Sequence, residues 1–219
     1  MKTIAVISQK GGSGKSTISV HLAVAAQQHG LRVAVVDLDP QATARKWGDN
    51  REVDEPEVIG DHAERLPQLV DAARTNGADL LVIDTAPNAD RASLTAARAA
   101  DLVLIPCRPS SFDLDAIEAT CDLADIAKKP AWVVLNAAPI RSAIVDEARK
   151  GLEAQGRKVA PQTVHVRVAF SHGVIDGRTA QELEPDGKAA EEIEALFSWA
   201  CGQVGLPAKP HAHKPTGEK

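Results

Sequence analysis

The feature that most constrains this chain is a glycine-rich run close to its start, Gln9-Lys10-Gly11-Gly12-Ser13-Gly14-Lys15-Ser16-Thr17. The apolar segment Ile4-Ala5-Val6-Ile7 precedes the run, and an amphipathic segment, residues 18–28, follows it. This strand–loop–helix order is the context that a phosphate-binding loop requires. Glycines let the backbone curl so that its N–H groups point at phosphate oxygens, and the helix behind adds the positive end of its dipole. The run therefore predicts a nucleotide site rather than an ordinary glycine-rich turn.

Residues of this loop have separate predicted tasks. Lys15 reaches the β- and γ-phosphates, and the Ser16 hydroxyl is placed to bind magnesium. The run departs from the standard pattern because Gln9 stands where a first glycine is expected and a second lysine, Lys10, follows it. Lys10 could reach a nucleotide held by a second copy of the chain, as an arginine finger does in trans, or it could be a solvated surface lysine. The predicted phosphate cradle is Gly11, Gly12, Ser13 and Gly14.

Apolar strand patterns and helical patterns alternate along the chain. The predicted strands are residues 3–8, 32–36, 80–84, 101–105 and 131–136, with a weaker one at 163–168. The predicted helices are residues 15–29, 61–76, 89–99, 112–127, 142–155 and 187–203. Gly30, Gly77 and Gly156 would end three helices, and Asp186 would cap the last. Unbroken apolar strands favour an α/β fold, a doubly wound, mostly parallel sheet flanked by helices.

Ligands of such a sheet bind beyond the carboxyl ends of its strands, where this chain carries its polar residues. Asp37 and Asp39 follow the second predicted strand, Asp84 ends the third, and Asn136 ends the fifth. Asp84 is placed to support magnesium, directly or through water. Asp37 and Asp39 share one side of an extended chain, so one could orient magnesium-bound water and the other the water that attacks the γ-phosphate. A role at the surface is the alternative for both.

The composition limits the partners of the chain. Its 219 residues suit a single domain, for which we expect a fold over residues 1–204 and a disordered, proline-rich tail over 205–219. The formal net charge of -5 means that contact with nucleic acid needs a local patch or several copies. The three cysteines are widely spaced and lack the pattern of a zinc or iron–sulfur site, so we expect isolated thiols.

The start of the chain and its hydropathy predict a cytoplasmic protein. The first predicted strand begins almost at Met1, so we expect neither a signal peptide nor an N-terminal helix-turn-helix domain. The apolar runs all fall short of the roughly 18 residues that cross a membrane.

Three segments resemble the P-loop NTPases of the deviant Walker A type, the ParA/MinD group of ATPases. Residues 10–17 look like the Walker A box of that group, Asp37-Leu38-Asp39-Pro40-Gln41 resembles its switch I, and residues 83–87 resemble its Walker B and switch II region. Residues 100–113, 177–182 and 190–194 are similar to ParA-type partition ATPases in particular. The resemblance covers residues 2–200 and favours the short form without a helix-turn-helix domain.

The resemblance implies an ATPase, weak unless stimulated, with ATP and Mg²⁺ as its ligands. Lys10 would match the signature lysine that contacts nucleotide across a sandwich dimer. Asp39 would match the residue that orients the hydrolytic water, and Asp37 and Asp84 would support magnesium. Asn136 would match a residue that contacts adenine. The remaining phosphate and magnesium contacts would be Lys15, Ser16 and Thr17.

The resemblance also implies partners and a task. ATP would close a homodimer that binds nonspecific DNA, so that the protein lies on the nucleoid. A ParB-like centromere-binding adaptor would stimulate hydrolysis and release, which would drive plasmid segregation. Candidate phosphate contacts on DNA, each otherwise a solvated charge, are Arg149, Lys150, Arg157, Lys158, Arg167, Arg178 and Lys188.

Three alternatives stay open, and the first of them would use the same ATPase residues. A partition-type ATPase could position a cargo other than a plasmid, such as a protein assembly or a chromosome. A MinD-like regulator at a membrane surface needs a C-terminal basic amphipathic helix, whereas the tail here has three prolines and no bulky apolar residue after Leu206. An electron carrier related to iron proteins needs cysteines that bridge two subunits, and Cys107 has no second cysteine close in sequence.

Overall fold

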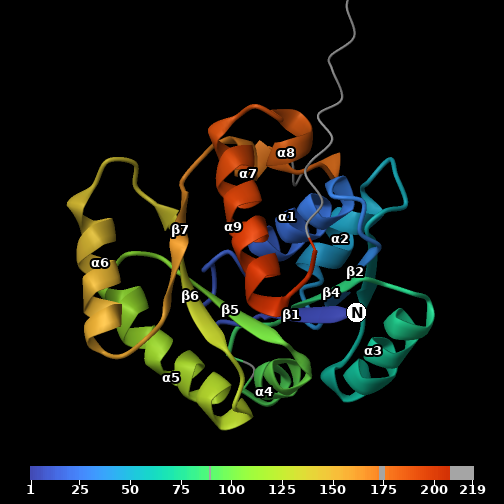
Figure 1. Ribbon diagram of the computed structural model, residues 1–219, viewed down its shortest axis with the longest axis horizontal. Helices are drawn as coiled ribbons and strands as arrows, with labels where there is room; N and C mark the ends of the chain where they lie inside the picture. The colour runs from blue at the N-terminus through green and yellow to red at the C-terminus, as the bar shows by residue number, and fades with distance from the viewer. Residues whose placement is uncertain (89, 173–175, 208–219) are drawn as a thin grey trace, which may run out of the picture.

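The computed structural model describes residues 1–88, 90–172 and 176–207, and within them seven strands form one sheet (Figure 1). The order across the sheet is β3-β2-β4-β1-β5-β6-β7, and every neighbouring pair is parallel. This confirms the predicted doubly wound α/β fold. The strands are β1 Lys2–Val6, β2 Val33–Asp37, β3 Glu57–Gly60, β4 Leu80–Asp84, β5 Leu102–Cys107, β6 Ala131–Ala138 and β7 Val159–His165.

Helices cover both faces of the sheet (Figure 1). Successive residues of β1 point to opposite faces, so Ile4 packs into one core and Ala5 into the other. The first core includes α1, α2 and α9, and the second includes α3 to α6. The helices are α1 Lys15–Gln28, α2 Thr43–Asp49, α3 Leu66–Thr75, α4 Asp90–Ala99, α5 Ser111–Ala127, α6 Ala143–Ala154, α7 Ala169–His172, α8 Ala180–Leu183 and α9 Lys188–Val204, with a short 3₁₀ helix, η1, at Ala63–Arg65.

Helix ends follow the predicted glycines but not the predicted cap of α9. Gly30, Gly77 and Gly156 stand just past three helices with φ of +74°, +75° and +77°, a conformation that costs glycine little. The prediction for Asp186 is wrong. The N-cap residue of α9 is Gly187, which has an extended backbone (φ -80°, ψ 157°). Its carbonyl oxygen accepts the first hydrogen bond of the helix, from Glu191 N at 3.0 Å.

Several elements differ from the sequence prediction. The sequence gives no clear pattern for β3, α2, α7 or α8, and the predicted helix 61–76 is shortened because η1 precedes α3. The predicted strand 163–168 is displaced: β7 ends at His165, and Val166 and Val168 are 61% and 67% exposed. Pairing explains the shift, because β7 pairs with β6 from Val159 to His165.

The remaining expectations concern cysteines, membrane spans and the tail. All three cysteines are free and buried, as predicted. Within the described ranges, no helix has the length and hydropathy to cross a membrane. Gly205 follows α9 with φ +65°, and most of the predicted tail, residues 208–219, lies outside the described residues.

Candidate functional site

The glycine-rich loop joins β1 to α1 at the centre of the carboxyl edge of the sheet, because β1 lies between β4 and β5. Gly14 is the N-cap residue of α1 and has φ +93°. A Cβ atom at Gly14 would stand 2.1 Å from Asn136 Nδ2, so this position has no room for a side chain. The loop thus has the tight curl that the sequence predicts for a phosphate cradle.

Asn136 lies near the carboxyl end of β6, two strands away from β1, and its side chain contacts this loop. It is buried, and its Nδ2 donates to the Ser13 carbonyl oxygen at 2.7 Å. Directly after it, β6 is irregular: Ala137 has φ +48°, and the register with β7 shifts between Leu135 and Ala138. The resemblance implies an adenine contact for Asn136, and in this structure its amide holds the loop backbone.

Lys15, at the start of α1, is a buried cation. Its side chain donates from Nζ to the Lys10 carbonyl oxygen at 3.3 Å, and the residue is 6% exposed. Burial lowers the pKa of Lys15, while the nearby carboxylates of Asp84 and Asp39 act in the opposite direction. A buried ammonium whose one hydrogen-bond partner among the described residues is a carbonyl oxygen fits an incoming phosphate well.

Asp84 ends β4 and is fully buried beneath the loop. Ser19 Oγ donates to its Oδ1 at 3.3 Å, while Oδ2 has no hydrogen-bond partner among the described residues. Burial raises the pKa of Asp84 to about 7, opposed by hydrogen bonding from Ser16. A buried carboxylate oxygen without a partner is costly, and a divalent cation or its water would satisfy it.

Asp37 and Asp39 have different surroundings although they are two residues apart. Asp37 is buried, and its two oxygens accept from Asp39 N and from Arg45 N, each at 2.9 Å. Burial raises its pKa, and these backbone hydrogen bonds act against the rise. Asp39 is half-buried and accepts from Gln41 N at 2.8 Å. Asp37 therefore ties residues 37–41 to α2, while Asp39 lines a cavity of 690 Å³ between these residues, η1 and α4.

The rim of the loop is fixed by contacts that the sequence alone did not indicate. Gln9 N donates to Thr120 Oγ1 of α5 at 3.1 Å, and the Gln9 carbonyl oxygen accepts from Asn88 N at 3.1 Å. Lys10 Nζ lies 3.7 Å from Asp113 Oδ1 at the start of α5. Thr120 and Asp113 come near the loop only through the tertiary fold, so no local motif could have identified them.

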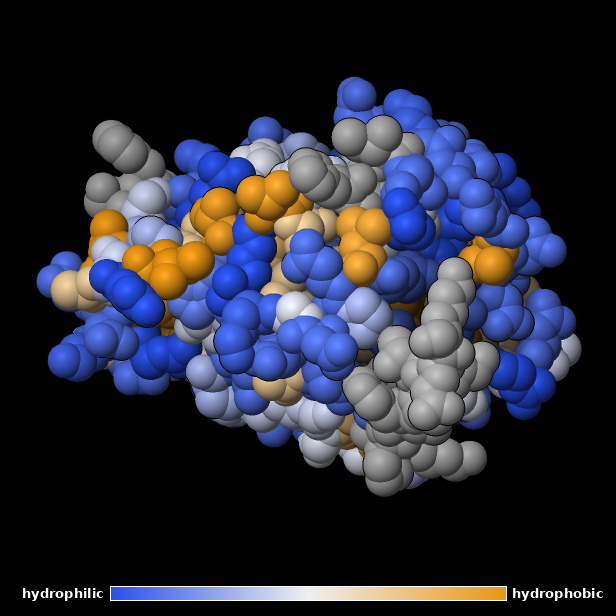
Figure 2. All heavy atoms as spheres, turned by 90° about the horizontal axis from the view of Figure 1, so that it is seen from above, coloured by the Kyte–Doolittle hydropathy of each residue, from blue (hydrophilic) through white to orange (hydrophobic). Residues whose placement is uncertain are grey.

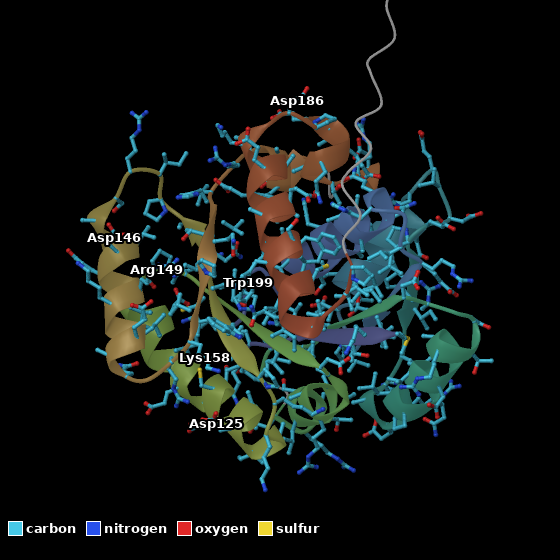
Figure 3. All side chains as sticks on the ribbon, viewed as in Figure 1. Asp125, Asp146, Arg149, Lys158, Asp186 and Trp199 are labelled. Carbon is cyan, nitrogen blue, oxygen red and sulfur yellow. The ribbon has the colours of Figure 1, made fainter. Side chains whose placement is uncertain are left out.

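Most of the candidate DNA contacts have partners within the chain. Arg149 lies between α6 and β7 (Figure 3), where it donates to the Ala160 carbonyl oxygen at 2.7 Å. Lys158 lies 5.5 Å from the centroid of the Trp132 ring. Lys150 is exposed and makes none of the ion pairs found between described residues. The others pair with carboxylates: Arg157 with Asp122 and Asp125, Arg167 with Glu192, Arg178 with Asp176 and Lys188 with Glu191.

Exposed apolar side chains gather near the carboxyl ends of β6 and β7. Ile140 and Ile144 belong to the turn and first residues of α6, and Val166 and Val168 follow β7; all four are exposed. Figure 2 shows apolar groups that interrupt an otherwise hydrophilic surface. Such groups are available for contact with another protein surface.

A parallel sheet with a glycine-rich loop, a buried lysine and an unpartnered buried carboxylate oxygen defines a P-loop nucleotide-binding protein. Residues 4–179 match the family described as CobQ/CobB/MinD/ParA nucleotide binding domain, and the chain belongs to this family. It is an ATPase of the ParA/MinD type, and its loop and Asp84 suit ATP with Mg²⁺.

Individual relatives and solved structures span between half and nearly all of the chain. Maintenance of carboxysome distribution protein A of Halothiobacillus neapolitanus is 32% identical over 207 residues, which are 90% of this chain and 94% of that protein. The chromosome-partitioning ATPase Soj of Thermus thermophilus is 30% identical over 53% of this chain and 59% of its own length. The septum site-determining protein MinD of Pyrococcus horikoshii, complexed with Mg-ADP, has the same fold, with a TM-score of 0.76, 18% identity and coverage of 94% and 98% of the two chains.

Proposed function

We propose that this chain is an ATP-driven positioning ATPase that works as a switchable dimer on DNA. It binds ATP and Mg²⁺, closes into a nucleotide sandwich dimer, binds nonspecific DNA and is released when an adaptor protein stimulates hydrolysis. The observation that carries the proposal is that one glycine-rich loop brings together the buried Lys15, whose Nζ donates to the Lys10 carbonyl oxygen, and Asp84, whose Oδ2 has no hydrogen-bond partner among the described residues.

The protein's own residues define how such a site would work. Lys15 would exchange its hydrogen bond to the Lys10 carbonyl oxygen for one to phosphate. Ser16, Asp37 and Asp84 would hold Mg²⁺, which neutralises phosphate charge when bound. Thr17 and the backbone of residues 11–14 would contact phosphate, and Asn136 would lie beside the adenine.

Hydrolysis would be controlled from switch I. Asp39 is half-buried beside the loop and its charge acts on Lys15, which suits it to orient the attacking water. Asp37 accepts from Arg45 N at the start of α2, so a change at Asp39 would reach α2 through a short chain of hydrogen bonds. The Lys10 side chain is 45% exposed on the rim, where a second subunit could approach.

The proposed cargo is a protein assembly. A relative named for carboxysome distribution spans 90% of this chain, whereas the chromosome-partitioning relative spans 53%. Plasmid or chromosome segregation with a ParB-like adaptor is the second candidate, because the partition ATPases share the same loop. The two differ in what is lost when the gene is deleted: scattered or clustered protein assemblies support the first, and loss of a plasmid with assemblies still evenly placed supports the second.

The DNA step has a direct test. We would measure binding to random-sequence duplex DNA with ATP and Mg²⁺, with ADP and without nucleotide, at two salt concentrations. Because the chain carries a net charge of -5, we expect binding only when ATP assembles two subunits, and weaker binding at the higher salt concentration. If the protein binds nucleotide but has no affinity for DNA in any nucleotide state, the proposed binding to nonspecific DNA is refuted. The protein would lie in the cytoplasm and on the nucleoid when ATP is bound.

A further inference from the structure

Arg108 lies against the glycine-rich loop. Arg108 directly follows β5, and β5 pairs with β1, so its carboxyl end is next to the start of the loop. The Nη2 atom of Arg108 is 3.5 Å from the point where a Cβ on Gly12 would stand. The guanidinium group therefore lies against the loop at Gly12.

The backbone at Arg108 is held while its side chain stays available. The Arg108 carbonyl oxygen accepts from Ser110 N at 2.8 Å and from Cys107 Sγ at 3.3 Å, and the next residue, Pro109, is buried. The Arg108 residue is exposed, and within the described part of the chain its guanidinium has neither a carboxylate nor a carbonyl partner. The backbone of Arg108 is thus held in place, while its side chain remains free to bind an anion.

Charges around the loop single out this arginine. Lys10 lies 3.7 Å from Asp113, and Lys15 lies in the field of Asp84 and Asp39. Arg108 is the cation at this loop that lacks an acidic neighbour among the described residues. Guanidinium offers five N–H donors in a planar arrangement that matches phosphate oxygens, so the exposed Arg108 side chain can exchange water for two oxygens of one phosphate.

We propose that Arg108 is a phosphate-binding residue that contacts the phosphate chain of the nucleotide next to Gly12. The inference rests on the proposed nucleotide site and adds a residue to it. The phosphate could belong to the nucleotide of the same subunit or to that of a second subunit packed against this rim. The chemistry is the same in both cases, and binding and assembly measurements separate them.

The test compares wild type, Arg108→Ala and Arg108→Lys by calorimetry with ADP and with a non-hydrolysable ATP analogue, followed by light scattering. Contact with the same subunit's nucleotide predicts a roughly 10- to 100-fold loss of analogue affinity in Arg108→Ala at protein concentrations too low for dimers. Contact across the dimer predicts unchanged affinity there and a loss of analogue-dependent dimers. Arg108→Lys should recover part of either loss, because lysine keeps the positive charge but lacks the planar set of N–H donors.

A matched control separates this effect from loss of surface charge. Arg98 is an exposed arginine in the last turn of α4, and Arg98→Ala should bind nucleotide and dimerise as wild type does. If Arg108→Ala matches wild type in affinity and in assembly, the proposal is overturned. Equal losses in the Arg98 and Arg108 variants would also overturn it, since net charge would then explain both. A wild-type protein that binds no nucleotide would refute the proposed function itself.

Discussion

The contact between Gly14 and Asn136 makes a quantitative prediction about the loop. A Cβ at Gly14 would stand 2.1 Å from Asn136 Nδ2, and Gly14 has φ +93°. In Gly14→Ala we expect about 1–2 kcal/mol of backbone strain and about 1–3 kcal/mol from the clash. In Asn136→Ala we expect a loss of about 1–3 kcal/mol, because the Ser13 carbonyl oxygen loses its donor.

The double variant tests whether this contact exists. Removing the Asn136 amide also removes the atom that the new methyl group strikes, so the strain remains but the clash disappears. The Gly14→Ala, Asn136→Ala protein should therefore lose less stability than the sum of the single variants, by about 1–3 kcal/mol. Urea unfolding of all four proteins without nucleotide measures this difference. Additivity within about 0.5 kcal/mol would refute the packing of Asn136 under the loop.

Further predictions concern pH, a buried ion pair and turnover. Burial lowers the pKa of His21 from the ordinary 6.5 to about 4, so the unfolded chain binds this proton more tightly than the folded chain does. The free energy of unfolding should therefore fall by about 3 kcal/mol as the pH drops from 6.5 to 4. This loss should be smaller in His21→Gln. The Arg51 side chain is 2% exposed and donates hydrogen bonds to Glu182 from both of its terminal nitrogens. Arg51→Ala should therefore lower the free energy of unfolding in urea by roughly 2–4 kcal/mol. A change below about 0.5 kcal/mol would contradict the presence of this buried ion pair. In nucleotide-binding and phosphate-release assays, Lys15→Ala should lose nucleotide binding, whereas Asp39→Ala should bind ATP but stop turnover; normal hydrolysis by Asp39→Ala would remove its assigned role.

The fold could be predicted where the sequence repeats its signals. Strands such as β4 are apolar at nearly every position, and glycines follow three helices, so the alternation of strands and helices is readable. The edge strand β3 carries no such signal, because Glu57 and Gly60 are exposed and only two half-buried residues lie between them. Likewise, α2 has seven residues and depends on tertiary contacts, such as the Trp47 Nε1 hydrogen bond to the Arg178 carbonyl oxygen at 3.1 Å.

The candidate site shows the same limit. The loop, Asp84 and Asp39 could be identified because a phosphate site needs these residue types at the ends of neighbouring strands. Thr120 and Arg108 could not, since each reaches the loop from a position that has no fixed spacing to it. Ser19 follows the loop on α1 at a fixed spacing, but its hydrogen bond to Asp84 depends on how α1 packs against β4. The predicted DNA contacts were chosen by charge alone, and the carboxylates that pair with Arg157 and Arg167 lie far from them in sequence.

The central claim is that nucleotide state controls assembly, and Asp39→Ala tests it most directly because it should hold ATP without consuming it. Light scattering of this variant with ATP and Mg²⁺ should give the mass of a dimer, and with ADP the mass of a monomer. Adding Lys10→Ala should reduce the dimer if Lys10 reaches the second nucleotide. The same mass with ATP, with ADP and without nucleotide would contradict the account.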